Sequence, residues 1–512
     1  MHTVPFLTLL IILPAAGSLL LALLGLDRTI SKDICDAIGI VVSLATLVIA
    51  VSTVVAMKVS FGGYQLTSDH TYSGTALGVR WFLGIDGISV FLVLLAAVLF
   101  PLVLILGRSR ANSRTYFAWM LLLEAAVLGS FLSLDLIVFF FMFELTLVPS
   151  YFIIAGWGHE RRAYAAVKFF LYTFLGSAFL FVGIVALAFL HQSQTHVLTF
   201  SLPALEHTHL SSTTEILLFL AFTAAFAVKA PLFPLHTWSP DAYTEAPEEG
   251  SVILSGVLAK IGTYGIIRFD LNLFPHATRT LAPLFLTLAV IGILYGAIVA
   301  CAQRDLKRLV TYSSLAQIGF IALGTFALST QGLAGAVLLM LNHGIIVGAL
   351  FILVGFIYQR RGTWQANELR GLQKAAPIMA GVFTVVMMAS IGVPGLNGFV
   401  SEFLVLSGTF ITHRWWATVA VVGVIVSAIY LLWAYQQVFH GEPGPGDATT
   451  RDLVWLERLV VAPLIILIVF LGIYPKPVLD RIDPSVNQLI AHVESSTGHY
   501  QPAVATKGVG GH

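Results

Sequence analysis

The sequence contains little charge and almost no cysteine. Of its 512 residues, 10% are charged and 58% are hydrophobic, whereas soluble domains carry about 25% charged residues. A chain this apolar is expected to be a polytopic membrane protein, and its net charge of +1 argues against a nucleic-acid partner. The two cysteines, Cys35 and Cys301, fall in different segments. They cannot hold an iron–sulfur cluster, which needs about four thiolates.

Motifs of nucleotide and zinc sites are missing as well. No Gly-rich phosphate loop follows a strand-like segment, and no His-Glu-x-x-His sequence occurs. We therefore expect no redox, nucleotide or metal cofactor on this chain itself.

What the sequence does contain is a series of long apolar runs. The first 26 residues lack a basic segment ahead of the apolar stretch, which favours a retained span over a cleaved signal peptide. Hydropathy predicts an all-α membrane fold of about 14 transmembrane helices. The predicted spans lie near residues 4–25, 33–57, 86–107, 115–133, 134–155, 164–190, 214–232, 250–272, 280–300, 308–326, 335–357, 375–411, 416–438 and 458–474.

Two of these spans are interrupted. The twelfth is too long for one straight helix and contains Val-Pro-Gly-Leu-Asn-Gly, while the seventh reaches a break at Lys229-Ala230-Pro231. Each proline removes a backbone donor and clashes with the preceding turn. Pro231 would thereby free the carbonyl of Ala227 to line a small wet cavity.

The breaks define the expected organisation of the chain. Spans 4–8 and 9–13 form two five-span blocks, and broken helices at related places in inverted repeats mark a transport path. The predicted parts are an N-terminal three-helix part, two five-helix repeats, and helix 14 with a polar C-terminal tail, at residues 1–114, 115–272, 273–440 and 441–512.

Lys and Arg are distributed unequally between the two sets of loops. One set carries 17 of these residues, including Arg28, and the other carries 8, including Arg268 and Lys507. The positive-inside rule places the richer set on the cytoplasmic side, so both termini are predicted to lie outside.

Lys260 is a charged residue in the middle of an apolar span. It lies ten residues after Gly250, about 15 Å along a helix, and hence near the centre of a hydrocarbon core about 30 Å thick. A charge at that depth costs at least about 2.5–3.5 kcal/mol. A lysine held there can release and regain a proton, although a permanent structural ion pair is the alternative.

Other titratable residues occupy the spans. Glu144 is either a protonated carboxyl in apolar surroundings or the partner of Lys229, which could instead extend to the membrane interface. Glu402 follows the second break, where it would serve ion transfer or satisfy exposed backbone groups. His343 and Glu124 are each open between proton transfer and a structural hydrogen bond.

The loop residues have simpler interpretations. Asp135 is expected to cap a helix at the interface. The acidic group Asp241, Glu245, Glu248 and Glu249 is expected to dock or cap rather than to bind a metal. The histidine group His191, His196, His207 and His209 is expected to be a solvated outer loop rather than a zinc site.

Several segments match a known family. The chain resembles the antiporter-like membrane subunits of proton-pumping NADH:quinone oxidoreductase, or respiratory complex I, and within them the group called chain M. The matching segments lie between about residues 115 and 412 and read SLDLIVFFFMFELTLVPSYFII, AAVKFFLYTFLGS, AFAVKAPLFPLHTWSPDAYTEAP, GSVILSGVLAKIGTYGIIRF, AQRDLKRLVTYSSLAQIGF and GVPGLNGFVSEF.

The resemblance implies a role for each intramembrane residue. Glu144 and Lys229 would form the charged pair of a first half-channel, and Lys260 would be the central proton-carrying lysine. His343 would act as a relay, and Glu402 as the terminal carboxylate of a second half-channel. Glutamate at that last position is typical of chain M, whereas sister chains L and N and antiporter relatives usually have lysine.

The resemblance also implies a setting and a mechanism. The chain would lie in a bacterial inner membrane beside other complex I subunits, especially chains L and N. NADH, FMN, iron–sulfur clusters and quinone would bind to other subunits. Quinone reduction there would change the Glu144–Lys229 pairing and thus the proton affinity of Lys260, which would pass a proton through hydrated residues to Glu402.

The sequence departs from many relatives at three places. Gln317 and Tyr243 stand where these have histidine, and Glu248-Glu249 stands where they have Thr-Ala. Because glutamine and tyrosine do not protonate as imidazole does, either water would serve at position 317 or the proton path would differ.

Proton translocation without redox chemistry on this chain is therefore the expected function. The alternatives are a subunit of a multisubunit Na⁺/H⁺ antiporter, against which Glu402 argues, and a subunit of a membrane-bound hydrogenase or formate-linked complex. A third alternative is a scaffold whose ion pairs only hold helices together.

Overall fold

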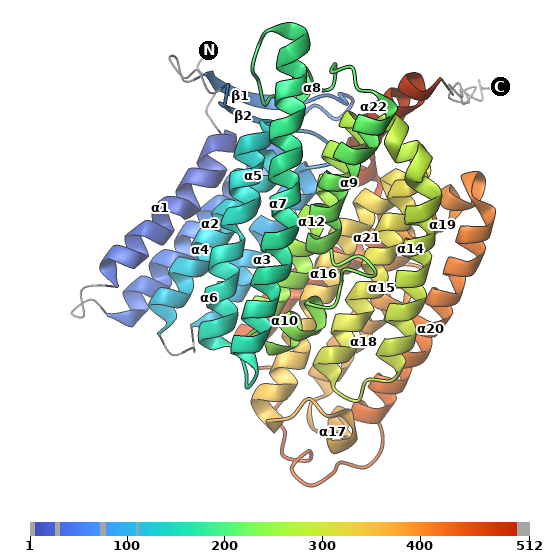
Figure 1. Cartoon of the computed structure of the whole chain (residues 1–512). Helices are drawn as coiled ribbons and strands as arrows, with labels where there is room; N and C mark the ends of the chain where they lie inside the picture. The colour runs from blue at the N-terminus through green and yellow to red at the C-terminus, as the bar shows by residue number, and fades with distance from the viewer. Residues whose placement is uncertain (1–5, 26–30, 72–77, 109, 111, 499–512) are drawn as a thin grey trace, which may run out of the picture.

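Long helices run side by side through most of the chain (Figure 1). The computed structural model describes residues 6–25, 31–71, 78–108, 110 and 112–498, so Arg28 and Lys507 lie outside the described residues. Within this described part, 13 helical runs are long and apolar enough to cross a membrane. The broken pair α18 (Pro377–Ile391) and α19 (Asn397–Thr412) adds the remaining span, and the prediction of about 14 spans is confirmed.

The other elements, in chain order, are α1 (Phe6–Leu24), α2 (Lys32–Ala56), β1 (Gln65–Thr71), β2 (Arg80–Ile85), α3 (Val90–Gly107), α4 (Ser113–Leu132), α5 (Leu136–Leu145), α6 (Leu147–Trp157), α7 (Arg162–Thr195), α8 (Leu202–Leu205), α9 (Ser212–Lys229), α10 (Ser239–Glu245), α11 (Glu248–Ile253), η1 (Leu254–Leu258), α12 (Ala259–Gly265), η2 (Ile266–Asp270), α13 (Leu271–Leu273), α14 (Pro275–Cys301), α15 (Leu306–Phe326), α16 (Thr330–Arg361), η3 (Ala366–Glu368), α17 (Leu372–Ala375), α20 (Arg414–Phe439), α21 (Trp455–Ile473) and α22 (Lys476–Thr497).

The seventh span breaks where the sequence predicts. Helix α9 ends at Lys229, and the freed carbonyl of Ala227 accepts a hydrogen bond from the Leu232 N–H at 2.9 Å. The Val228 carbonyl accepts another from the Trp238 indole at 2.9 Å. The Ala227 carbonyl, predicted to line a wet cavity, thus already has one backbone partner. The adjoining cavity of about 150 Å³ is lined by apolar side chains apart from Thr223.

The second break depends on glycine. Gly392 and Gly395, between α18 and α19, have φ values of +82° and +93°, a region that side chains larger than glycine rarely adopt. A Cβ atom at Gly392 would also lie 2.5 Å from an oxygen of Glu402. The missing side chain therefore lets the chain turn and leaves space for this carboxyl group.

The eighth span lies at the centre of the bundle. Every residue from Glu248 to Leu271 is buried, and so are those of α16 from Gly332 to Ile357. The eighth span is not a uniform α-helix, because the π-helical turns η1 and η2 interrupt it. Such turns widen a helix and often occur at functional sites. The first of them ends two residues before Lys260.

One end of the bundle carries the small sheet and an additional helix. Strands β1 and β2 pair antiparallel, with a register irregularity between Gln65 and Ser68. Helix α22 lies at the same end (Figure 1) and packs against α13, α14 and α16. The part of the predicted polar tail at Lys476–Thr497 is a helix, in which apolar residues recur every three or four positions and give an amphipathic surface.

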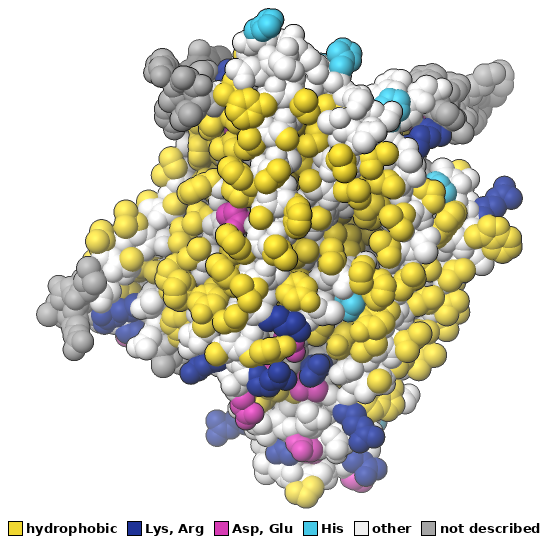
Figure 2. All heavy atoms as spheres, viewed as in Figure 1, with side chains coloured by type: hydrophobic (Ala, Val, Ile, Leu, Met, Phe, Trp, Pro, Cys, Tyr) yellow, Lys and Arg dark blue, Asp and Glu magenta, His cyan; other side chains and the backbone are white. Residues whose placement is uncertain are grey.

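The surface carries a wide apolar band. Figure 2 shows hydrophobic side chains over the middle of one face, and Lys and Arg gathered mainly at the end opposite the sheet. A band of this kind suits contact with hydrocarbon, while the polar ends suit the two aqueous sides.

Candidate functional site

Lys260 is fully buried at the start of α12, with no exposed surface. Its ammonium donates a hydrogen bond to the Ser255 carbonyl at 2.7 Å. This carbonyl belongs to η1, five residues earlier. The π-helical turn thus brings a backbone acceptor to the lysine in a place where lipid and apolar side chains provide none.

His343 supplies the second contact of Lys260. It lies in α16, and its Nδ1 is 2.8 Å from the lysine Nζ. Because an ammonium group only donates hydrogen bonds, Nδ1 acts as the acceptor when Lys260 is charged, and the ring proton then lies on Nε2. Nε2 is buried and has no hydrogen-bond partner among the described residues. The imidazole can therefore take a proton from Lys260 on one side and offer one on the other.

Glu402 lies in α19 and is 6% exposed. Its Oε1 accepts a hydrogen bond from the Gln317 side-chain amide on α15 at 2.7 Å. Gln317, one of the departures from relatives, therefore contacts the predicted terminal carboxylate directly. The Gln317 Oε1 is buried and has no partner among the described residues. This oxygen can therefore accept a hydrogen bond from water.

Two sets of polar contacts connect the surroundings of Lys260 with those of Glu402. Asn342, beside His343, donates to the Asn397 carbonyl at 2.8 Å and to the Ser401 hydroxyl at 3.2 Å. Ser401 immediately precedes Glu402.

The second connection runs along α15. The hydroxyls of Ser255 and Ser314 lie 2.8 Å apart, and Ser314 precedes Gln317 by one turn on the same helix face. Sequence reasoning missed both serines. The Ser314–Gln317 spacing was visible in the sequence, but hydroxyls in membrane helices commonly bond to their own backbone and so carry little signal.

Glu144 and Lys229 are near each other without a direct contact. Lys229 is 2% exposed, and its ammonium donates to the Thr146 hydroxyl at 2.7 Å and lies 4.7 Å from the centre of the Phe143 ring. Glu144 is partly exposed. The two residues influence each other electrostatically, but no ion pair within 4 Å joins them in the described part of the chain.

Glu124 and Asp135 lie apart from this group. The buried Glu124 carboxyl accepts a hydrogen bond from Ser43 on α2 at 3.0 Å and so faces the N-terminal helices. Asp135 caps α5, as predicted, by accepting from the N–H groups of Ile137 and Val138. Burial raises the pKa of Asp135 to about 6, against the opposing effect of these N–H groups.

The acidic loop group makes specific contacts at the end opposite the sheet. Asp241 pairs with Lys168 at 2.7 Å, and Glu245 accepts from the Arg161 N–H at 2.8 Å. Glu248 and Glu249 both contact Arg110, and the pKa of Arg110 is raised despite its burial because these carboxylates favour its charged form. The expectation that this group docks segments is confirmed.

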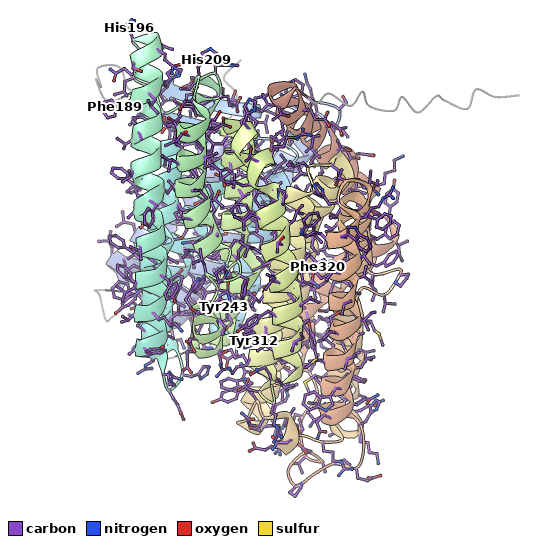
Figure 3. The ribbon with its side chains drawn as sticks, turned by 45° about the vertical axis from the view of Figure 1, so that its right-hand side comes forward. Phe189, His196, His209, Tyr243, Tyr312 and Phe320 are labelled. Carbon is purple, nitrogen blue, oxygen red and sulfur yellow. The ribbon has the colours of Figure 1, made fainter. Side chains whose placement is uncertain are left out.

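Tyr243, the second departure from relatives, lies in the lower half of the bundle in Figure 3. It is 1% exposed, and its hydroxyl has no partner among the described residues. Burial raises its pKa, so the phenol stays neutral and cannot act as a charged relay.

The outer histidines are not all in a loop. Helix α7 extends to Thr195, so His191 is helical, and its Nδ1 is 2.9 Å from the Thr208 hydroxyl. Figure 3 shows His196 and His209 at the upper end of the molecule. The described residues contain no group of three or more His, Cys, Asp or Glu side chains that could hold a metal ion.

Arg268 was predicted among outer-loop residues, but it is 3% exposed inside the bundle. Its guanidinium pairs with Asp86 at 2.6 Å and contacts the Tyr264 hydroxyl at 3.0 Å. A polar cavity of about 110 Å³ adjoins this pair and is also lined by Glu206 and His492. Because Arg268 lies near a helix end, the sequence did not indicate this buried ion pair.

Known proteins align with this chain over nearly its whole length. Residues 133–428 match the family described as "NADH:quinone oxidoreductase/Mrp antiporter, TM". The NADH-quinone oxidoreductase subunit M of Mycobacterium tuberculosis is 39% identical, and the alignment covers 98% of this chain and 96% of that protein.

Solved structures show the same helical arrangement. A chain of respiratory complex I from Thermus thermophilus superposes with a TM-score of 0.86 at 30% identity, over 95% of this chain and 99% of that chain. A chain of the Mrp complex from Dietzia superposes with a TM-score of 0.82 at 22% identity, over 96% of this chain and 100% of that chain. At this lower identity, the similarity to the Mrp chain shows the fold alone.

Proposed function

Because the chain belongs to the NADH:quinone oxidoreductase/Mrp antiporter membrane family, we propose that it is the M-type proton-translocating membrane subunit of respiratory complex I. Its work is to move protons across the membrane while NADH oxidation and quinone reduction take place on other subunits. The supporting relatives are those of complex I, which match over nearly full length.

One observation carries the assignment of proton transfer to this chain. Lys260, at the centre of the buried eighth span, has both a titratable partner, His343, and a polar connection toward Glu402. Buried titratable residues are costly in a membrane and mark proton relays. A scaffold could hold the same helices together with apolar packing, which costs less than a buried lysine.

The proton steps follow from donors and acceptors. Lys260 gives a proton to His343 Nδ1 or to water at the Ser255–Ser314 hydroxyls. Water held by Gln317 Oε1 completes the transfer to Glu402, because the glutamine amide itself cannot protonate. Glu402 then releases the proton toward the end of the bundle that carries the sheet.

Glu144 and Lys229 set the proton affinity of Lys260 from a distance. In the structure, Lys229 bonds to Thr146 rather than to Glu144. In a direct Glu144–Lys229 pair, the carboxylate would offset the positive charge of Lys229. Less positive charge would then act on Lys260, and its proton affinity would rise. Quinone chemistry elsewhere in the complex would control that pairing.

The setting is the inner membrane of a bacterium. The basic end of the bundle faces the cytoplasm and the sheet end faces outward. Sister chains L and N and the lipid bilayer are its neighbours, while NADH, FMN, iron–sulfur clusters and quinone bind to other subunits.

A sodium/proton antiporter subunit is the second candidate, favoured by the shared fold of the Mrp chain. The test uses the purified complex that contains this chain, reconstituted into liposomes. We expect NADH-driven proton movement that persists unchanged without sodium. Strict dependence on sodium would favour the antiporter function, and absence of any NADH-linked proton movement would contradict the proposed function.

A further inference from the structure

An apolar slot lies between α2 and α21, near the end of the bundle that carries the sheet. Its volume is about 250 Å³, and Arg481 supplies the only polar side chain among the described residues that line it. Two central helices also line the slot, α3 through Leu94 and Val98 and α16 through Leu341 and Ile345. The slot therefore reaches from exposed helices inward to the core of the bundle.

The slot runs lengthwise along α3. Phe91, Leu94, Leu95 and Val98 line it and share one face of the helix. From Phe91 to Val98 the helix rises about 10 Å, whereas half of the hydrocarbon core measures about 15 Å. An acyl chain parallel to α3 would therefore have most of its length inside the slot.

The helices on either side of the slot are the least enclosed of the membrane spans. Only 28% of the apolar window is buried in α2 and in α21, the lowest share among the 13 spans of the described part. Val55 of α2 and Ile473 of α21 are 75% and 71% exposed. An open apolar face of this kind marks contact with lipid, so membrane lipid is the medium that meets the slot.

Arg481 lies in α22 and lacks an acidic partner. Its Nη1 donates to the Pro477 carbonyl at 2.9 Å, while its Nε is buried and has no hydrogen-bond partner among the described residues. Asp480 and Asp483 are close in sequence. No ion pair within 4 Å joins either of them to Arg481 in the part of the chain that the structure describes.

The backbone fixes Arg481 at the end of the slot. Helix α22 packs directly on Gly87, just ahead of α3, where a Cβ atom would collide with the Arg481 carbonyl. The Gly87 N–H also donates to the Ser485 hydroxyl at 3.0 Å. The guanidinium is thus held beside the Phe91 end of the slot, and a ligand would meet a preformed site.

An anion from outside the chain would complete the contacts of Arg481. Arg80 and Arg268, at the same end of the bundle, each pair with an aspartate of this chain. A buried donor without an acceptor lowers stability, and the arginine fork matches phosphate oxygens through two parallel hydrogen bonds. Lipid phosphates lie just outside the hydrocarbon core, at the level where the slot ends.

We propose that the slot binds one phospholipid, with an acyl chain along α3 and its phosphate on the Arg481 guanidinium. The acyl chain fills the cavity with packing contacts, and the phosphate accepts hydrogen bonds from the arginine. A purely apolar occupant, such as the side of a neighbouring helix, would leave the guanidinium unpaired. This inference concerns lipid binding and does not depend on proton transfer by the chain.

The experiment uses the purified complex that contains this chain and phosphatidylglycerol with a photoreactive diazirine on one acyl chain. After irradiation, mass spectrometry locates the labelled residues. Labels on Leu341 and Ile345 report the slot, because these residues are only 5% and 1% exposed. Labels on Leu171 and Leu175 of α7, which are 59% and 64% exposed, report the lipid that surrounds the protein.

We expect both sites to be labelled in the wild type, and Arg481→Met to lower labelling of the slot about tenfold without changing that of α7. Lys476→Met is the matched control, because it removes an exposed cation of the same helix that does not line the slot. Equal slot labelling in the two variants overturns the proposal. So does a wild-type slot that stays unlabelled while α7 is labelled, as a neighbouring helix in the slot would cause.

A second variant keeps the proposal testable if Arg481→Met does not assemble. Leu94→Trp fills the slot with a larger side chain and leaves Arg481 in place, and we expect it to abolish slot labelling. Unlabelled phosphatidylglycerol should compete for the wild-type slot better than a free fatty acid of the same chain length. Labelling that persists in Leu94→Trp, or stronger competition by the fatty acid, contradicts a phospholipid site.

Discussion

Lys260 Nζ and His343 Nδ1 lie 2.8 Å apart, although the two residues belong to different five-helix blocks. Lys260 comes from the eighth span and His343 from α16. The side-chain hydrogen-bond partner of Lys260 is thus supplied by the other block. A small shift between the blocks would break or make this contact, which gives long-range coupling a place to act.

Replacement of His343 tests this contact. His343→Leu removes the acceptor beside Lys260, and we expect coupled proton pumping to fall by about tenfold or more, as for the loss of a proton-transfer group. His492→Gln is the control, because His492 lies at the outer end and contacts the Asn272 carbonyl. The measurement is proton uptake by vesicles at equal complex content, and pumping equal to the control would contradict a relay role for His343.

Gln317 gives a different test, because it holds Glu402 without carrying a proton. Gln317→Leu leaves the buried carboxyl unpaired, at a cost of about 1–3 kcal/mol, and we expect both pumping and complex stability to fall. Gln317→His restores an imidazole and should retain pumping with a changed pH profile. Identical pH profiles for the wild type and Gln317→His would show that position 317 lies outside the proton path.

The Arg268–Asp86 pair is predicted to be a stability element. Removing one partner of a buried ion pair costs about 3–5 kcal/mol, because the other charge is left uncompensated. Arg268→Met and Asp86→Asn should each lower the apparent melting temperature of the purified complex. The double variant should melt above at least one single variant, and strictly additive losses would contradict direct coupling between the two residues.

Glu206 should make stability depend on pH at the outer end. Burial raises its pKa to about 7, while Arg268 opposes the rise. The folded chain therefore binds this proton more tightly than the unfolded chain, in which glutamate titrates near about 4.3. The resulting stabilisation is fully present below that value and is lost as pH rises through about 7.

The matching measurement is the melting temperature of the complex between pH 5 and pH 8. The loss on raising the pH should be smaller in Glu206→Gln, whose side chain stays neutral throughout. An equal loss in the variant and the wild type would assign the pH dependence to other groups.

Much of the fold was predictable because a membrane imposes simple rules. Long apolar runs had to form helices, and Pro231 had to interrupt one of them. The position of Lys260 in the middle of the eighth span followed from the extent of the apolar run alone. Helix α22 was not predicted because its apolar residues are interspersed among polar ones. The mean hydropathy of the segment is therefore low.

The contacts within the candidate site were less predictable. The sequence could place Lys229 near a helix end, but it could not show that Thr146, rather than Glu144, accepts its hydrogen bond. The bond between Ser255 and Lys260 depends on a π-helical turn, for which the sequence offers no clear signal. Arg268 looked like an interfacial residue, because its partner Asp86 is distant in sequence and comes close only through the fold.

The most direct test of the account is proton pumping by the Lys260→Met complex. Methionine fills a similar volume and removes the titratable amine, and assembly can be verified from the amount of intact complex in the membrane. We predict that NADH-driven proton uptake per complex is largely lost although the complex assembles. Uptake equal to that of the wild type in a fully assembled Lys260→Met complex would contradict the account.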